Sequence, residues 1–169
     1  CVKVWIKGGS RADPINQKGA HQLLGSLLSR GCGPHSNIDI ADLVEGCGAG
    51  LRCDTTEDGL IISLKCADYD ANRLLPLIGW MISDPHITTE QLKLERDLTI
   101  QSLQRQSENP YHVAFDGWRQ IAYGDGVYGH DPLGSIIDLK ELTRKELLPL
   151  GESLSLKTEV LAISGTFSN

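Results

Sequence analysis

The segment from His21 to Gly25, His-Gln-Leu-Leu-Gly, contains one side chain that could take part in metal chemistry. A helix that holds Zn²⁺ for hydrolysis needs two histidines four residues apart, because side chains at i and i+4 share one face. It also needs a carboxylate beside the second histidine to take a proton from zinc-bound water. Here Leu24 and Gly25 occupy those two positions. The segment has therefore either lost a zinc site or never had one.

The surroundings of His21 favour a structural role for its imidazole. Apolar residues recur at helical spacing and predict a helix over residues 19–30. On that helix His21 is interpreted as a partly buried polar residue on an apolar face, and the alternative is a relic metal ligand. Gly25 costs about 1 kcal/mol of helix propensity relative to alanine. That cost indicates close packing of the helix against a neighbouring strand.

Length and composition indicate one ordinary globular domain. The chain has 169 residues, of which 40% are hydrophobic and 22% are charged. A chain of this length can bury most of its apolar surface without disulfides or metals. The net charge of −6 argues against nucleic acid and anionic membranes as partners. No apolar run approaches the roughly 18 residues of a membrane span, so a soluble protein is expected.

The cysteines do not form a disulfide framework, because their number is odd and their spacing is irregular. They are Cys1, Cys32, Cys47, Cys53 and Cys66. This usage favours a reducing compartment, either the cytoplasm or an organelle matrix. Cys32-Gly-Pro-His35 has the spacing of a metal-binding pair, but no second pair accompanies it. The segment is interpreted as a turn.

Sequence periodicity predicts an α+β fold, with an antiparallel-rich mixed sheet packed against helices. Strands are expected over residues 2–6, 50–55, 59–66 and 159–164, with a hairpin turn at 56–59. Helices are expected over residues 19–30, 38–45, 68–83, 89–107, 113–123 and 144–154. Ser36 or Asn37 is a plausible cap for the second helix, and Thr143 is one for the last. Pro76 is awkward inside its helix, since an interior proline loses a hydrogen bond.

An ordered series of short motifs resembles one domain of the pitrilysin, insulinase and mitochondrial processing peptidase family. The motifs are Gly9-Ser10-Arg11, Pro14, Gly19-Ala20-His21, Glu45-Gly46-Cys47-Gly48-Ala49, Thr55, Leu74-Leu75-Pro76-Leu77-Ile78, Asp84-Pro85, Glu95-Arg96-Asp97-Leu98, Tyr123-Gly124, Gly129, Pro132-Leu133-Gly134 and Ile163-Ser164-Gly165. Each is weak alone, but their order and spacing cover nearly the whole chain. The resemblance implies that residues 1–169 are a single N-terminal-type domain that starts inside its first strands. It also implies a second homologous domain in the full protein, outside this chain.

The same resemblance implies where a zinc site would lie. The family's third ligand is a glutamate 77 positions beyond the second histidine, and counting from Gly25 reaches Ser102. The vestigial site would then read His21, Leu24, Gly25 and Ser102. Leucine cannot accept a proton, glycine has no side chain, and a neutral serine hydroxyl is a poor zinc ligand. No catalytic residue and no metal are therefore expected in this chain, and zinc is expected only in a catalytic partner.

The function implied by the resemblance is that of a non-catalytic, peptidase-like subunit. In the mitochondrial processing peptidase one subunit is active, and its partner lacks the zinc motif. This chain is expected to pair with a homologous catalytic peptidase, or with itself, and to help form a peptide-binding chamber. Arg52, Cys53 and Thr55 lie on the strand that resembles the family's substrate-binding edge, which holds extended peptides through main-chain hydrogen bonds. The alternative for this strand is simple pairing within the sheet.

Two other functions remain open at this point. The chain could be an active zinc endopeptidase with an atypical metal site that recruits His35, Cys32, Cys47 or Cys53. It could instead be a purely structural scaffold, like the respiratory-complex core proteins that resemble this family. The glycine-rich residues 124–134 lack the phosphate-binding pattern Gly-x-x-x-x-Gly-Lys-Ser/Thr and are interpreted as a flexible surface loop.

Overall fold

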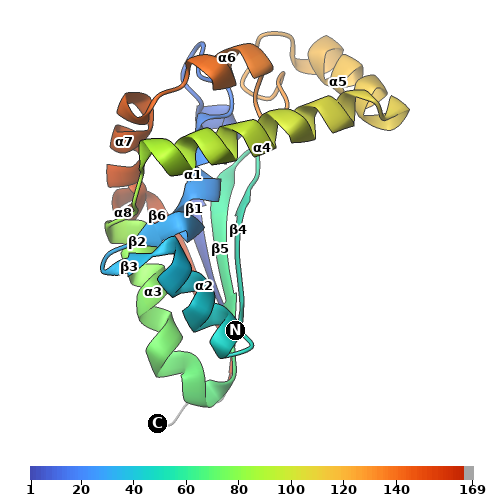
Figure 1. The fold of residues 1–169 in the computed structure, drawn as a ribbon. Helices are drawn as coiled ribbons and strands as arrows, with labels where there is room; N and C mark the ends of the chain where they lie inside the picture. The colour runs from blue at the N-terminus through green and yellow to red at the C-terminus, as the bar shows by residue number, and fades with distance from the viewer. Residues whose placement is uncertain (166–169) are drawn as a thin grey trace.

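The computed structural model describes residues 1–165 as a four-stranded sheet with helices packed on one of its faces (Figure 1). Across the sheet the strands are β4 (Gly50–Thr55), β5 (Gly59–Lys65), β1 (Val2–Lys7) and β6 (Thr158–Ile163). All three strand pairings are antiparallel. This arrangement confirms the expected α+β class and the expected hairpin, which joins β4 to β5.

Eight α-helices complete the described part of the chain. They are α1 (Ala20–Leu27), α2 (Asn37–Gly46), α3 (Ala71–Ser83), α4 (Thr89–Ser107), α5 (Pro110–Tyr123), α6 (Ile136–Glu141), α7 (Arg144–Glu152) and α8 (Leu154–Lys157). Short 3₁₀ turns occur at η1 (Ser10–Ala12), η2 (Leu28–Arg30) and η3 (Asp68–Asp70), and a small hairpin joins β2 (Gly31–Cys32) to β3 (His35–Ser36). In Figure 1 the long helix α4 crosses above α1, and α5 projects at its far end.

The hydrophobic core lies between the sheet and the helices. Alternate residues of β1 and β5 point into it, as the two-residue period of a strand requires. The most deeply buried members are Ile6, Leu60, Ile62 and Leu64 from the strands and Leu23, Leu24 and Leu27 from α1. The intervening residues Lys3, Trp5 and Lys7 therefore face the side of the sheet that these helices leave open.

Local capping explains where several helices begin. Ser36 and Asp39 form a reciprocal capping box at the start of α2, so the serine is the cap that the sequence suggested. Thr143 caps α7 in the same way. α5 begins at Pro110, three residues before the expected start, because the Asn109 side chain accepts from Tyr111 N and a proline is well suited to a first helical turn.

Three helices differ in other ways from the expectation. Residues 28–30 continue α1 as a 3₁₀ turn, and the helix expected over 144–154 divides into α7 and α8 at Ser153. The helix expected over 68–83 begins with the 3₁₀ turn η3, and, as expected, Pro76 lies inside α3 without ending it. Within residues 1–165, no helix combines the length and the apolarity that crossing a bilayer requires.

Candidate functional site

The position expected for a second zinc-binding histidine is closed by a strand. A Cβ placed on Gly25 would lie 2.4 Å from Thr55 Oγ1 and 2.7 Å from Leu60 Cδ2. The Thr55 hydroxyl also donates to the main-chain oxygen of His21 at 3.3 Å, which ties β4 to α1. This close approach is the physical reason for a glycine inside the helix. It leaves no room for a side chain at Gly25 unless the side chains of Thr55 and Leu60 shift.

The neighbouring position, which would carry the catalytic base, belongs to the core. Leu24 is fully buried. A Cβ on Gly151 of α7 would lie 3.7 Å from Leu24 Cδ1, so the leucine side chain extends toward that helix. Burying a leucine contributes roughly 1.5–3 kcal/mol. Where a zinc peptidase would need a carboxylate to accept a proton, the Leu24 side chain thus stabilises the packing of α1 on α7.

His21 is buried and held by a carboxylate. Its Nδ1 lies 2.8 Å from Asp13 Oδ1, and its main-chain N donates to the same oxygen at 2.9 Å. Because an ionised carboxylate only accepts hydrogen bonds, Nδ1 carries the ring proton. The other ring nitrogen, Nε2, faces Gly8, where a Cβ would lie 3.2 Å away. A carboxylate behind the ring is the arrangement that orients histidines which bind metals through Nε2.

Asp13 connects His21 to a second histidine. His130 Nε2 lies 3.5 Å from Asp13 Oδ2, and Gly19 N donates to the same oxygen at 2.7 Å. Burial raises the pKa of this carboxyl, but the nearby His130 ring and the hydrogen bonds from His21 and the main chain outweigh burial, so the pKa of Asp13 lies below its ordinary value of 3.8. The carboxylate is therefore ionised at neutral pH.

Ser102 stands apart from this cluster. It lies on α4, and its hydroxyl donates to Leu98 O of the same helix at 3.0 Å. The buried carboxylate of α4 is Glu95, two turns earlier, which is 6% exposed and accepts from Arg30 Nε at 2.6 Å. α4 does pack against α1, as Figure 1 shows. The Glu95 carboxylate, which α4 places near the end of α1, is thus neutralised by Arg30.

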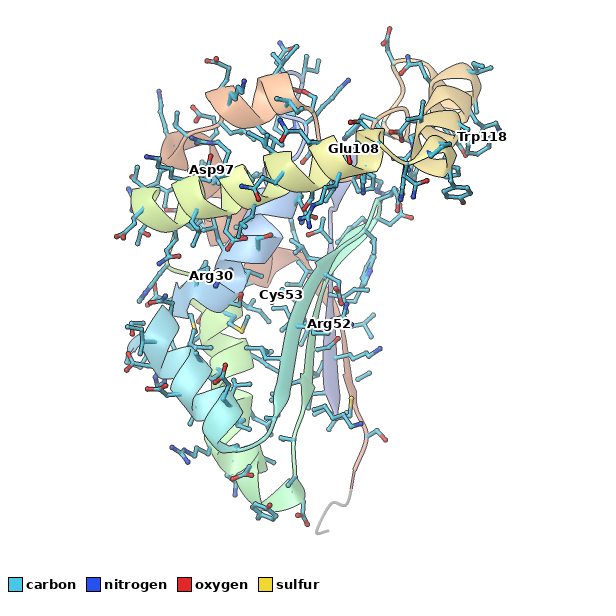
Figure 2. All side chains as sticks on the ribbon, turned by 45° about the vertical axis from the view of Figure 1, so that its right-hand side comes forward. Arg30, Arg52, Cys53, Asp97, Glu108 and Trp118 are labelled. Atoms are coloured by element: carbon cyan, nitrogen blue, oxygen red, sulfur yellow. The ribbon has the colours of Figure 1, made fainter. Side chains whose placement is uncertain are left out.

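The three residues expected to contact substrate divide between two faces of β4. Cys53 points toward the helices and Arg52 to the open face (Figure 2). Thr55 also points toward the helices, since its hydroxyl bonds to α1, and Arg52 pairs with Asp54 at 2.9 Å. Within the described residues β4 is an edge strand, paired with β5 alone. Thr56 N donates to Gly59 O at 2.9 Å, and hydrogen-bonded pairs alternate along an antiparallel ladder. The main-chain groups of Cys53 and Thr55 therefore point away from β5, toward the free edge.

The residues suggested for an atypical metal site do not make up a metal-binding group within the described residues. Among residues 1–165, no group of three or more His, Cys, Asp or Glu side chains is arranged to hold a metal ion. Burial, followed by the charge of Asp84, raises the pKa of the Cys32 thiol to about 11, so it is a poor source of thiolate. Cys53 packs against the core as a small apolar side chain, and burial, with a smaller contribution from Asp54, raises its pKa to about 12.

The comparison of the sequence with known families is decisive for classification. Residues 1–133 match the sequence profile of the family described as Insulinase (Peptidase family M16). The chain belongs to this family. The resemblance inferred from its scattered motifs is thereby confirmed.

Curated relatives of this M16 chain include processing peptidases and bacterial zinc proteases. It is 24% identical over 147 residues to the human mitochondrial-processing peptidase subunit beta, covering 87% of this chain and 30% of that protein. It is 23% identical over 146 residues to an uncharacterized zinc protease of Mycobacterium leprae, covering 86% of this chain and 33% of the relative. The chain thus spans about a third of the length of these curated relatives.

Solved structures show the same fold. The peptidase M16 inactive domain from Pseudomonas fluorescens superposes with a TM-score of 0.79 at 22% identity, covering 86% of this chain and 36% of that one. A protease from Helicobacter pylori superposes with a TM-score of 0.83 at 18% identity, covering 90% of this chain and 37% of that one.

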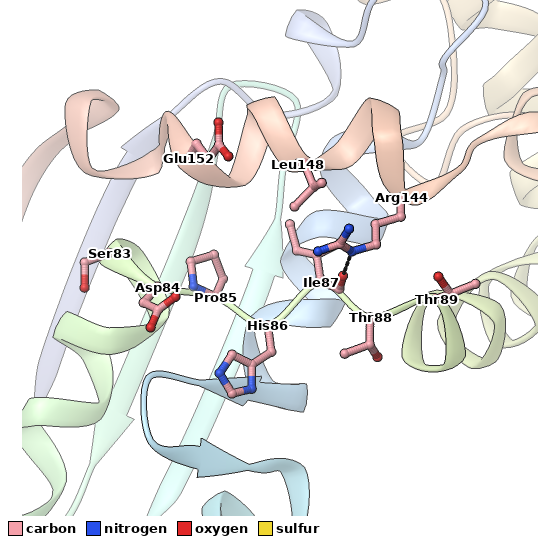
Figure 3. A pocket seen from close by; sticks show the side chains of 10 residues that line it. All are labelled: Ser83, Asp84, Pro85, His86, Ile87, Thr88, Thr89, Arg144, Leu148 and Glu152. Carbon is pink, nitrogen blue, oxygen red and sulfur yellow. Dashed lines mark hydrogen bonds between the residues drawn. The ribbon is translucent and has the colours of Figure 1, made fainter.

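One cavity of this M16 domain is lined by residues other than the predicted zinc-site positions (Figure 3). It has a volume of about 610 Å³ and lies between the α3–α4 connection and α7. Arg144 Nε donates to Ile87 O at 2.6 Å across its wall. Neither His21 nor Ser102 lines it. The cavity is therefore separate in its lining from the site that the resemblance implies.

Sequence reasoning missed Asp13 and His130. Asp13 lies eight residues before His21 in a stretch interpreted as a loop, and His130 lies in the glycine-rich segment interpreted as flexible. In the structure that segment is anchored, because Tyr128 OH donates to Asp58 Oδ1 at 2.8 Å and Arg119 donates to His130 O. No spacing rule connects residues 13, 21 and 130, so only the tertiary structure reveals the cluster.

Proposed function

We propose that this M16 chain is a non-catalytic, peptidase-like domain that pairs with a homologous zinc-dependent peptidase and helps to form its peptide-binding chamber. The observation that carries the proposal is the contact between Gly25 and Thr55. It fills the space in which a second histidine would stand. Residues 1–169 would be one N-terminal-type domain, and a second homologous domain would lie elsewhere in the full protein.

The residues at the positions predicted for the zinc site favour a loss of catalysis over a rearranged zinc site. Leu24 is committed to the core, and the Ser102 hydroxyl is bonded within its own helix. One imidazole, that of His21, remains with its orienting carboxylate Asp13. A single neutral ligand cannot hold Zn²⁺ against water, since structural and catalytic zinc sites use three or four protein ligands.

The relatives support the pairing. The human relative is described as one subunit of a processing peptidase, and the Pseudomonas fluorescens structure is described as an inactive domain. A chain that keeps this fold without the zinc-site side chains fits the role of the second member of such a pair. The partner we propose is a homologue that carries an intact His-x-x-Glu-His motif.

The edge of β4 is the surface we propose for peptides. The main-chain groups of Leu51, Cys53 and Thr55 point outward there, at the spacing that a bound strand would match. Arg52 would contact the bound peptide from the open face of the sheet. An extended peptide would add to β4 as a fifth strand.

The pairing is tested with the full protein and the homologous His-x-x-Glu-His peptidase of the same organism. The two are co-purified, and cleavage of a fluorogenic peptide is measured with each alone and with both. We expect no cleavage by this protein alone and faster cleavage by the mixture than by the partner. Equal rates for partner and mixture contradict the assisting role. Stoichiometric zinc that survives a mild chelator wash of this protein alone contradicts the loss of the site.

The peptide edge is tested by removing one outward N–H. Cys53→Pro deletes a donor at the free edge, a position where an edge strand tolerates proline. Cys53→Val is the matched control, because it keeps the N–H and the apolar side chain. We expect the proline variant to lose the assistance to the partner and the valine variant to retain it, with circular dichroism confirming that both are folded. Equal assistance by both variants contradicts peptide addition at β4.

A further inference from the structure

The cavity between the α3–α4 connection and α7 carries charges of opposite sign at its two ends (Figure 3). Arg144 lies at one end with Thr88 and Thr89, and Asp84 and Glu152 lie at the other. The apolar side chains of the lining lie between these ends and are Pro85, Ile87 and Leu148. The volume of about 610 Å³ falls within the range of small-molecule sites. The cavity thus has a cationic end, an apolar centre and an anionic end.

The charged groups of this lining are available to a ligand. Arg144 donates from Nε to Ile87 O at 2.6 Å, and within residues 1–165 its two Nη groups have no hydrogen-bond or ion-pair partner. The carboxylates of Asp84 and Glu152 likewise have none among the described residues. His86 also lines the cavity, but its Nε2 is already hydrogen-bonded to Gly33 O at 2.9 Å. One guanidinium and two carboxylates therefore decide which ligand the cavity accepts.

The two ends of α7 carry charges that its macrodipole disfavours. Arg144 is the first residue of this helix and Glu152 is the last. A helix is stabilised by anions near its N-terminus and by cations near its C-terminus, which is the opposite order. Leu148 lies halfway between them, and residues four apart share one face of a helix. Helix stability therefore does not account for this arrangement, whereas recognition of a ligand with two charged ends does.

We propose that this cavity binds a short peptide with free ends, whose carboxylate contacts Arg144 and whose ammonium group contacts Asp84 and Glu152. A rise of 1.5 Å per residue places Arg144 and Glu152 about 12 Å apart along α7. A peptide of about three extended residues spans about 10 Å, and the side chains at both ends reach the remaining distance. The lining includes no residue of the β4 edge and none of the predicted zinc-site positions, so this inference does not rest on the proposed function.

The presence of both signs of charge selects the class of ligand. A guanidinium can hold a carboxylate through two parallel hydrogen bonds, and charge-assisted bonds are roughly twice as strong as neutral ones. A simple anion would be repelled by Asp84 and Glu152, and a simple amine would be repelled by Arg144. An internal stretch of a protein chain has neither charged end. A free peptide satisfies both ends and places its middle residue against the apolar centre.

The probe is trialanine, and its binding to the full protein is measured by equilibrium dialysis. The controls are N-acetyl-trialanine, trialanine amide, the doubly capped peptide and inorganic phosphate. We expect trialanine to bind and each single cap to weaken binding by about tenfold, because it removes one charge-assisted contact. Failure of trialanine to bind overturns the proposal. So does equal affinity for the free and the doubly capped peptide, or phosphate that binds as tightly as trialanine.

Variants of the protein then establish the direction of the bound peptide. Arg144→Gln keeps a donor for Ile87 O, and it should no longer distinguish trialanine from its amide. Asp84→Asn with Glu152→Gln should no longer distinguish trialanine from its N-acetyl form. Lys145→Gln is the matched control, since Lys145 is exposed on α7 outside the lining, and it should leave all affinities unchanged.

Circular dichroism checks that each variant is folded. Folded variants that still respond to both caps as the wild type does overturn the proposal. The series of capped peptides on the wild type decides it independently of any variant, so a variant that fails to fold does not remove the test.

Discussion

The two faces of the four-stranded sheet differ in which side chains they bury and which they leave exposed. On the helix-covered face, Gly25 is closed by Thr55 and Leu24 is fully buried, so the positions for chemistry have become packing positions. On the open face, Trp5 and its apolar neighbours stay partly exposed between cations. Packing residues thus occupy the positions predicted for a zinc site, while the opposite face carries apolar and cationic side chains that the described helices leave uncovered. The following predictions test this contrast.

The largest effect is expected from restoring a side chain at the closed position. Gly25→His should lower the free energy of unfolding by about 3 kcal/mol, because its Cβ would overlap Thr55 Oγ1 and its imidazole has no space. Urea denaturation measures the change. Gly46→His on α2 is the control, since no atom lies within 4 Å of a Cβ there. A Gly25→His variant as stable as the control contradicts the interpretation that Thr55 and Leu60 leave no space for a side chain at Gly25.

The thiols under the helices should be almost unreactive. The raised pKa values of Cys32, about 11, and Cys53, about 12, leave very little thiolate at pH 8. Alkylation by iodoacetamide, followed by mass spectrometry, should be at least about a hundredfold slower there than at the exposed Cys1, a difference of about 2.7 kcal/mol. Modification of Cys53 as fast as that of Cys1 would show that the β4 side of the core opens readily.

Asp13→Asn should cost about 2 kcal/mol, because it removes a buried carboxylate that accepts from His21 and Gly19. The pKa of Asp13 is lower in the folded state than in the unfolded state. Its stabilisation is therefore fully present above the unfolded pKa of about 3.9 and is lost as pH falls through the folded pKa.

Urea denaturation measured from pH 6 downward tests the expected loss of stability at low pH. Below about pH 4 the stability of the wild type should fall toward that of Asp13→Asn, so that the two curves converge. Asp97→Asn, at an exposed site on α4, is the matched control and should follow the wild type. Parallel curves for Asp13→Asn and the wild type would mean that Asp13 does not titrate as this cluster requires.

Local patterns in the sequence were enough to predict much of the fold. The two-residue period of 2–6 and 59–66 predicted strands, and Ser36 was correctly suggested as a cap. The helix-breaking cost of Gly25 predicted a close strand, which is β4. These features depend on residues close in sequence or on backbone geometry.

The Asp13–His21–His130 cluster and the pairing of Trp5 with Val160 on the open face could not be predicted in this way. Both depend on which distant segments become neighbours, and no local pattern encodes the register of Trp5 with Val160. Strand alternation does explain why Arg52 lies on the opposite face of β4 from Cys53 and Thr55. It requires only the knowledge that the odd-numbered residues of β4 face the helices.

The smallest effect on stability is expected on the open face. Lys3→Glu should change the free energy of unfolding by less than about 0.5 kcal/mol, because Lys3 is exposed and lies outside the core. Val4→Ala, the next residue on the same strand but buried at 2% exposure, should cost about 2 kcal/mol. Urea denaturation of both variants compares the two faces directly. A large loss from Lys3→Glu would mean that Lys3 stabilises the fold itself and that the two faces do not differ in the way proposed.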